Sequence, residues 1–137
     1  RWVAPADWKS AELQVQGALG HPADQGDGVR GRIISNRQGE VASFEARHRT
    51  RPTSLKLAIV GGEVLDFVVD DRENPGHDSF QWRVTLTAQV TAEQQASVAK
   101  KRWDSRDDFG GDRPEPLDPW AQVAQVMLIS NELMFLD

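Results

Sequence analysis

The chain has 137 residues, 39% of them hydrophobic and 27% charged, which is the size and composition of one folded domain rather than of a disordered segment. Its 16 Lys and Arg residues against 21 Asp and Glu residues give a net charge of -5, and this argues against a nucleic-acid-binding surface. The absence of cysteine excludes disulfides, thiolate metal sites, thiol nucleophiles and covalently attached haem.

The apolar runs and the first residues of the chain indicate whether it enters a membrane or carries a signal peptide. No apolar run reaches the roughly 18 residues that a membrane-spanning helix needs, so we expect no membrane insertion. The opening residues 1–5 lack the pattern of a signal peptide. We therefore expect the sequence to be an excised domain or a mature product.

Period-two alternation between apolar and polar residues dominates the chain from residue 11 to residue 88. Turn-forming residues interrupt it at 21–28, 36–39, 61–62 and 71–78. The pattern predicts six strands, over 11–19, 29–35, 40–48, 54–60, 63–70 and 79–88. In the last of these, Phe80, Trp82, Val84 and Leu86 share the inward face. Whether residues 2–9 add a further strand stays open.

One-sided alternation is typical of antiparallel sheets that pack one face on a core. A parallel sheet would need helical crossovers, and no segment between the strands has that pattern. Two packed sheets then make a sandwich or a jelly roll. We predict an all-β fold, an antiparallel, jelly-roll-like β-sandwich, as a domain over residues 1–90.

Residues 91–137 have a different pattern, which predicts a linker followed by a C-terminal amphipathic helix. Thr91 and Gln94 fit a capping box, so a short helix is expected over 91–102. A charged loop follows over 104–118. Asp118 and Pro119 then form a good helix start. The apolar stripe of that helix needs a partner, which could be the sandwich, another helix or another chain.

Four segments carry a resemblance to a known module: residues 1–9, 31–40, 62–70 and 78–82. They resemble the β-sandwich module of large planctomycete-type multidomain proteins that carry a cytochrome c domain. Residues 119–137 resemble the extreme C-terminus of the same proteins. The segment 62–82 also resembles modules attached to secreted bacterial carbohydrate-active proteins. The resemblance implies an exported, periplasmic or extracellular protein with a carbohydrate-binding-like sandwich. The haem-binding motif of that family is absent here.

Motifs for catalysis are missing from the chain. It has no cysteine and no Gly-x-Ser-x-Gly elbow, and its histidines, His21, His48 and His77, have no serine and acid partners at motif spacing. We therefore predict a protein that is not an enzyme and needs no cofactor. An uncharacterised hydrolase remains a third reading of the sequence.

Oxygen-bearing side chains in the 70–78 loop are the predicted metal ligands, and Asp24 with Asp27 and Asp107 with Asp108 and Asp112 form two further acidic clusters. Asp70, Asp71, Asn74 and Asp78 provide the oxygen ligands that calcium takes, although their spacing is not that of an EF-hand. Acids of this loop could also serve as a glycosidase pair. The alternative for both readings is an ordinary solvated acidic loop.

Exposed aromatic rings are the usual platforms for sugars, because the CH face of a sugar packs on a ring. Trp2, Trp8 and Trp103 lie outside the regular strands and are the predicted platform residues. The alternative is that these rings close the ends of the sandwich. Trp82, Phe44 and Phe67 are expected in the core, since they lie in register with inward-facing residues.

Basic side chains on the outer strand faces are the second set of candidate sugar ligands. Arg32, Arg47 and Arg83 are predicted to bind a sulfated or uronic-acid polysaccharide by charge-assisted hydrogen bonds. Their alternative is a mixed solvated surface.

The sequence thus predicts a non-catalytic carbohydrate-binding module that holds an exported multidomain protein near a polysaccharide. The alternative is a structural docking domain that packs against other domains of the parent protein through its C-terminal helix.

Overall fold

The computed structural model describes residues 1–73, 76–89 and 100–110. These residues form eight strands and no helix, and the fold of the described residues is all-β. The strands are β1 (Trp2–Val3), β2 (Ala11–Gly20), β3 (Val29–Ser35), β4 (Gly39–Ala46), β5 (Thr50–Ile59), β6 (Val64–Asp71), β7 (Gln81–Gln89) and β8 (Arg102–Asp104). No helix capable of crossing a membrane is found within these ranges.

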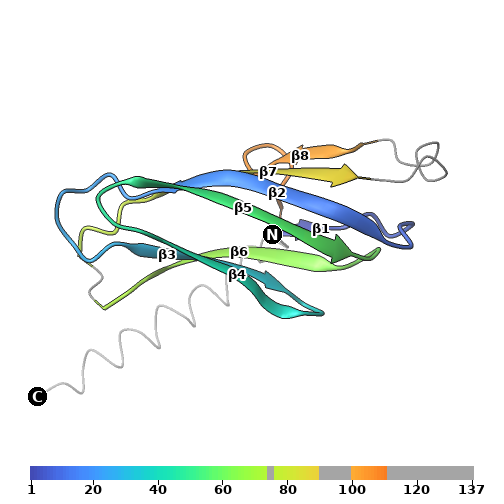
Figure 1. The fold of residues 1–137 in the computed structure, drawn as a ribbon, viewed down its shortest axis with the longest axis horizontal. Helices are drawn as coiled ribbons and strands as arrows, with labels where there is room; N and C mark the ends of the chain where they lie inside the picture. Colours follow the sequence, from blue (N-terminus) through green and yellow to red (C-terminus); the bar gives the residue numbers. More distant parts are fainter. Residues whose placement is uncertain (74–75, 90–99, 111–137) are drawn as a thin grey trace, which may run out of the picture.

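The strands form two antiparallel sheets of four strands each, stacked as two layers (Figure 1). Sheet A has the order β1-β6-β3-β4, and sheet B has the order β5-β2-β7-β8. The pairs β3–β4, β2–β5 and β1–β6 are nested in the sequence and fall alternately in sheet A, sheet B and sheet A. The result is a sandwich-like arrangement whose consecutive strands mostly change sheets.

The core lies between the two sheets and draws on both. Sheet A supplies Trp2, Ile33 and Leu65, and sheet B supplies Leu13 and Leu86, all of them 2% exposed or less. Every second residue of β2 faces this core at Leu13, Val15 and Leu19. The alternation predicted for residues 11–19 is therefore confirmed, because a pleated strand sends successive side chains to opposite faces.

Tight turns close one end of the molecule. Gly39 and Gly62 have φ values of 77° and 75°, which favour glycine because it has no Cβ to clash. The predicted turns at 36–39 and 61–62 are confirmed. Gly61 packs where a Cβ would lie 2.6 Å from the carbonyl oxygens of Ala6 and Trp8. The turn at Gly61 and Gly62 thus holds the segment that leads from β1 to β2.

Two predictions about the ends of the sheets need correction, and one question left open by the sequence is answered. Residues 102–104 form β8, which pairs with β7, so sheet B extends past the domain boundary predicted at residue 90 and Arg102 does not end a helix. Phe80 precedes β7 and is 50% exposed, because the strand begins only at Gln81. The undecided N-terminal strand is the two-residue β1. The predicted helix starting at residue 118 lies outside the described residues.

Candidate functional site

The three tryptophans predicted as a sugar platform are buried. Trp2 is 2% exposed, and Trp8 and Trp103 are each 8% exposed. Their ring centroids lie 5.2 to 6.2 Å apart, and Trp103 meets both other rings edge to face. They form a tryptophan cluster (Trp2, Trp8 and Trp103) in the core, so in this structure they offer no open ring face. Their burial agrees better with the alternative, in which these rings close the ends of the sandwich.

A different set of rings reaches the surface. Two adjoining hollows of about 300 and 630 Å³ share Trp82 and Ser105 as lining residues. We call them together the aromatic groove. Its rings are those of Phe67, Phe80, Trp82 and Phe109, which come from β6, from the start of β7 and from the turn after β8.

Trp82 is the central ring of the aromatic groove and is held from several sides. Phe44 and Phe67 meet its indole edge to face at centroid distances of 6.4 and 5.8 Å. The indole Nε1–H donates a hydrogen bond to Thr53 Oγ1 at 3.3 Å. The ring is half-buried, as predicted for a residue in register with the core, and yet one part of it lines an open hollow. A fixed, partly exposed indole is a suitable surface for an apolar ligand face.

Polar groups surround the rings. Gln81, Arg83, Ser105 and Arg106 line the larger hollow beside Trp82. The side chain of Arg83 lies 3.9 Å from Asp104, which is too far for a hydrogen bond. Arg1, at the other side of the groove, forms a bidentate pair with Asp66 at 2.8 and 2.9 Å. The hydrogen bond from Arg1 lowers the pKa of the Asp66 carboxyl, so that pair stays charged. The aromatic groove therefore combines apolar rings with amide, hydroxyl and guanidinium donors.

The three predicted arginines do not come together. Arg83 lines the aromatic groove. Arg32, on β3 of sheet A, lies 2.8 Å from Asp70 and 3.7 Å from Glu40. Arg47 follows β4 and donates to His48 Nε2 at 3.1 Å. Of the three, only Arg83 adjoins aromatic rings of the groove.

The predicted metal ligands are likewise dispersed. Asp70 is engaged by Arg30 at 3.0 Å and by Arg32 at 2.8 Å, while Asp71 is exposed. Asn74 lies outside the described residues. Both carboxylate oxygens of Asp78 are buried and accept no hydrogen bond in the described part of the chain. Within that part, no group of three or more His, Asp or Glu side chains is placed to hold a metal ion.

All three histidines meet at the end of the sandwich where β2 leads to β3. His21 is completely buried; its Nδ1 accepts the His48 N–H at 3.2 Å, so its Nε2–H donates to the His77 carbonyl at 2.9 Å. His48 Nδ1 contacts the carbonyl of Ala23 at 2.7 Å. The rings of His21 and His48 lie 5.6 Å apart. These bonds tie three loops together, which is a structural role.

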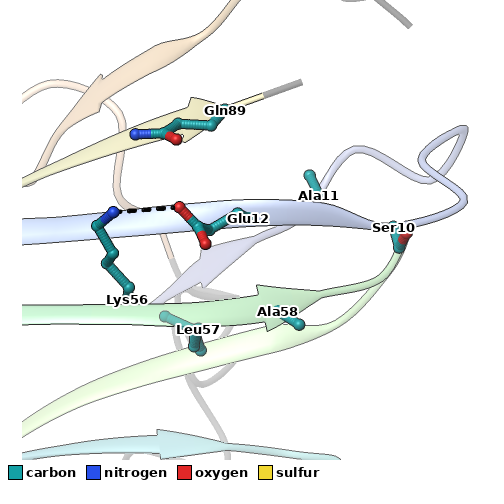
Figure 2. A pocket seen from close by; sticks show the side chains of 7 residues that line it. All are labelled: Ser10, Ala11, Glu12, Lys56, Leu57, Ala58 and Gln89. Atoms are coloured by element: carbon teal, nitrogen blue, oxygen red, sulfur yellow. Dashed lines mark ion pairs between the residues drawn. The ribbon is translucent and has the colours of Figure 1, made fainter. Parts of the chain in front are cut away.

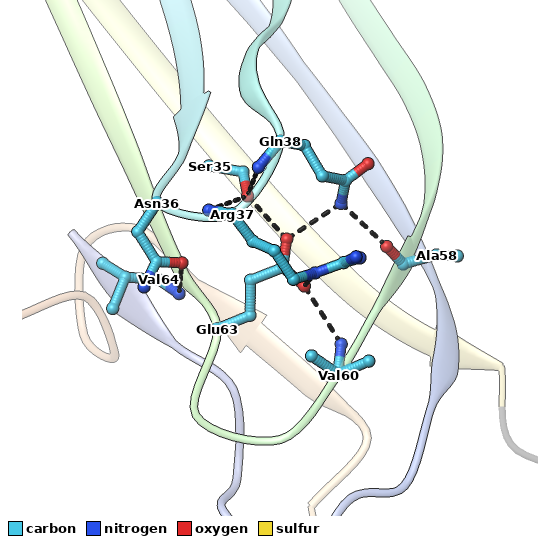
Figure 3. Close-up of polar contacts among 8 residues, drawn as sticks. All are labelled: Ser35, Asn36, Arg37, Gln38, Ala58, Val60, Glu63 and Val64. Carbon is cyan, nitrogen blue, oxygen red and sulfur yellow. Dashed lines mark hydrogen bonds and ion pairs between the residues drawn. The ribbon is translucent and has the colours of Figure 1, made fainter.

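A buried carboxylate performs the same task at the opposite end (Figure 3). Glu63 accepts hydrogen bonds from Ser35 at 2.5 Å, Gln38 at 2.8 Å and Arg37 at 3.0 Å, and from the Val60 N–H at 3.1 Å. Burial alone would raise the pKa of Glu63, but these four donors outweigh it and lower the pKa to about 2. The ionised carboxylate joins the turn after β3 to the turn after β5.

A further hollow of about 400 Å³ lies on the far end of sheet B (Figure 2). Lys56 of β5 reaches to Glu12 of β2 at 3.4 Å, and Gln89 of β7 is the register partner of Glu12. Figure 2 shows these three side chains on neighbouring strands. The hollow is lined by polar side chains and by Ala11, Leu57 and Ala58, without an aromatic ring.

The aromatic groove could not be predicted from alternation, which places the aromatic residues of its strands, Phe67, Phe80 and Trp82, in the core. Phe80 continues the inward register of β7 by one step, although the strand begins after it. Phe109 lies in the charged stretch that was expected to be a loop. Its position six residues after Trp103 carried no signal, since nothing local shows that the turn after β8 folds back toward Phe67, whose ring centroid is 5.0 Å away.

Comparisons of the chain with protein-family models, curated protein sequences and solved structures found no match. The family resemblance based on residues 1–9, 31–40, 62–70, 78–82 and 119–137 thus stays a prediction.

Proposed function

We propose that this protein is a non-catalytic carbohydrate-binding module that binds a glycan in the aromatic groove. The observation that carries the proposal is the pair of open hollows that share Trp82 and Ser105, one of them lined by Phe80 and the other by Gln81 and Arg83. Sugar rings need one apolar surface for their CH face and donors for their hydroxyl groups. The groove supplies both within one contiguous lining.

The topology supports the same proposal. Nested strand pairs that alternate between two sheets are the pattern of a jelly roll, and we infer a jelly-roll-like sandwich on that basis. Lectin domains are among the proteins that use this architecture. Fold alone does not imply function, so the proposal depends on the groove. In this proposal the module serves an exported parent protein, in the periplasm or outside the cell, and holds it near polysaccharide.

The docking alternative stays a prediction. It depends on the apolar stripe of residues 118–137, which lie outside the described part of the chain. Among the described residues, nothing favours docking over glycan binding. Trp82 lies beside several polar donors, and this mixture suits a sugar better than an apolar helix.

The test compares an exposed apolar side chain inside the aromatic groove with one outside it. Phe80 is 50% exposed in the aromatic groove, and Val3 is 52% exposed on β1. Titration calorimetry with a panel of neutral and acidic polysaccharides should show that Phe80→Ala weakens binding about tenfold. Val3→Ala should bind like the unaltered protein, and both variants should keep its melting temperature. Equal affinities for the two variants, or no binding by the unaltered protein, would overturn the proposal.

A further inference from the structure

The outer face of sheet B presents ordered rows of polar side chains across its strands. The register places Lys56, Gln14, Thr87 and Arg102 in one row, from β5 through β2 and β7 to β8. The next row contains Ser54, Gln16, Thr85 and Asp104. Their strand neighbours Leu13, Val15, Leu86 and Trp103 are buried, so these polar residues face outward. We call the two rows the polar lattice.

The middle positions of the polar lattice are uncharged; one row ends in the cations Lys56 and Arg102, and the other ends in Ser54 and the carboxylate of Asp104. Amides and hydroxyls fill the middle positions, while Lys56 and Arg102 stand at the two ends of one row. Three strand spacings of about 4.8 Å separate them, or about 14 Å. None of the eight residues is aromatic or aliphatic, so a ligand on this surface would be held by hydrogen bonds and charge.

The cations of the two sheets differ in how their donors are used. On sheet A, Arg1, Arg30 and Arg32 lie 2.8 to 3.0 Å from aspartates of β6. On sheet B, Lys56 lies 3.4 Å from Glu12 and Arg83 lies 3.9 Å from Asp104. Arg102 has no ion pair with any residue in the described part of the chain. Because charge-assisted hydrogen bonds are about 2.7–2.9 Å long, the sheet B cations keep donors that a ligand can use.

The polar lattice is continuous with the aromatic groove. Arg83 faces outward on β7, one outward position before Thr85, and it also lines the hollow beside Trp82. At the other end, Lys56 lines the hollow shown in Figure 2. A hollow therefore lies at each end of the same outer face, with the hydrogen-bonding rows between them.

From this arrangement we infer that the polar lattice is a second binding surface, which takes the anionic groups of a polysaccharide chain whose other part lies in the aromatic groove. The inference rests on the proposed function and adds the ligand class, a glycan that carries carboxylate or sulfate groups. Lys56 and Arg102 bind the anionic groups, and Gln14, Gln16, Thr85 and Thr87 bind hydroxyl groups between them.

The test uses the full chain with alginate as a carboxylated polymer, dextran sulfate as a sulfated polymer and dextran as a neutral one. The double variant Lys56→Gln/Arg102→Gln should weaken binding of at least one anionic polymer about tenfold or more. The variant Arg30→Gln removes one positive charge from the opposite sheet and should retain most of the affinity. Which anionic polymer loses affinity identifies the carboxylate or the sulfate as the bound group.

Each other outcome overturns the inference. If Arg30→Gln and the double variant lose affinity equally, the attraction is to charge in general. If dextran binds as tightly as the anionic polymers, or if only Phe80→Ala weakens binding, the polar lattice is not a binding surface, and the proposed function still stands. If none of the polymers binds while a wider neutral panel does, the ligand class is wrong. No binding to any polysaccharide would remove both proposals.

Discussion

Gly31 of β3 lies directly against the indole of Trp82, which belongs to the opposite sheet. A Cβ at Gly31 would lie 2.9 Å from Cζ3 of that ring and 3.1 Å from Leu19 Cδ2. The missing side chain in sheet A therefore sets how deeply the central ring of the aromatic groove sits in sheet B. Through this contact, the packing between the sheets and the shape of the proposed binding site are coupled.

Replacing Gly31 with alanine should disturb both the packing between the sheets and the shape of the aromatic groove. The added methyl group must push the Trp82 ring outward or separate the sheets, and overpacking of this kind costs about 1–3 kcal/mol of the free energy of unfolding. Urea unfolding measures the loss, and calorimetry measures the accompanying fall in glycan affinity. Gly110→Ala is the control, because a Cβ there has no neighbour within 4 Å. Unchanged stability of Gly31→Ala would mean that the sheets are not packed this closely.

Glu63→Gln should destabilise the protein by about 2 kcal/mol, because four donors then face a neutral amide, and one of its two head-group atoms no longer accepts. The pKa of Glu63 in the folded state, about 2, lies below its ordinary value of 4.5. Its contribution is therefore complete above pH 4.5 and is lost as the pH falls toward 2.

Unfolding free energies measured from pH 6 to pH 2 test this. The unaltered protein should lose stability across that window, and Glu63→Gln should lose less over the same range. Glu40→Gln removes an exposed carboxylate 3.7 Å from Arg32 and should change stability by less than about 1 kcal/mol. A parallel pH dependence in the unaltered protein and Glu63→Gln would contradict the role given to Glu63.

Trp103→Ala should destabilise the protein by about 3–5 kcal/mol, because it leaves a cavity between Trp2 and Trp8. If Trp103 were only a platform for sugar, Trp103→Ala would instead weaken glycan binding and leave the free energy of unfolding unchanged. Trp103→Phe, which retains an aromatic ring, should keep the fold and the glycan affinity. Thermal unfolding followed by circular dichroism, combined with calorimetry, separates the two cases. A stable Trp103→Ala variant with weakened binding would restore the platform interpretation.

His21→Phe should cost about 2–3 kcal/mol, since it leaves the His48 N–H and the His77 carbonyl without their partner in a buried site. His77→Gly is the matched comparison. The His77 side chain is exposed, its φ of 69° favours glycine, and its carbonyl is retained in the variant. We expect the free energy of unfolding of His77→Gly, measured in urea, to lie within about 1 kcal/mol of that of the unaltered protein. A reversed order of the two stabilities would contradict the loop-tying role of His21.

Local patterns were enough to predict the strands between residues 11 and 71. The alternation at Leu13, Val15 and Leu19 gives the buried face of β2, because a pleated strand fixes side-chain direction by position alone. The turns at Gly39 and Gly62 could also be predicted from the sequence, since a positive φ favours glycine. The all-β class follows from these local features.

Only the tertiary structure decided which aromatic rings reach solvent. Trp2, Trp8 and Trp103 have no regular pattern around them, yet they meet in the core from segments about 100 residues apart. Phe80 and Phe109 meet the aromatic groove because β7 begins late and the chain after β8 turns back toward β6. Alternation sets the direction of a side chain, but its exposure depends on which distant segment covers it. Contacts with such a distant segment are long-range, and the local alternation of apolar and polar residues does not predict them.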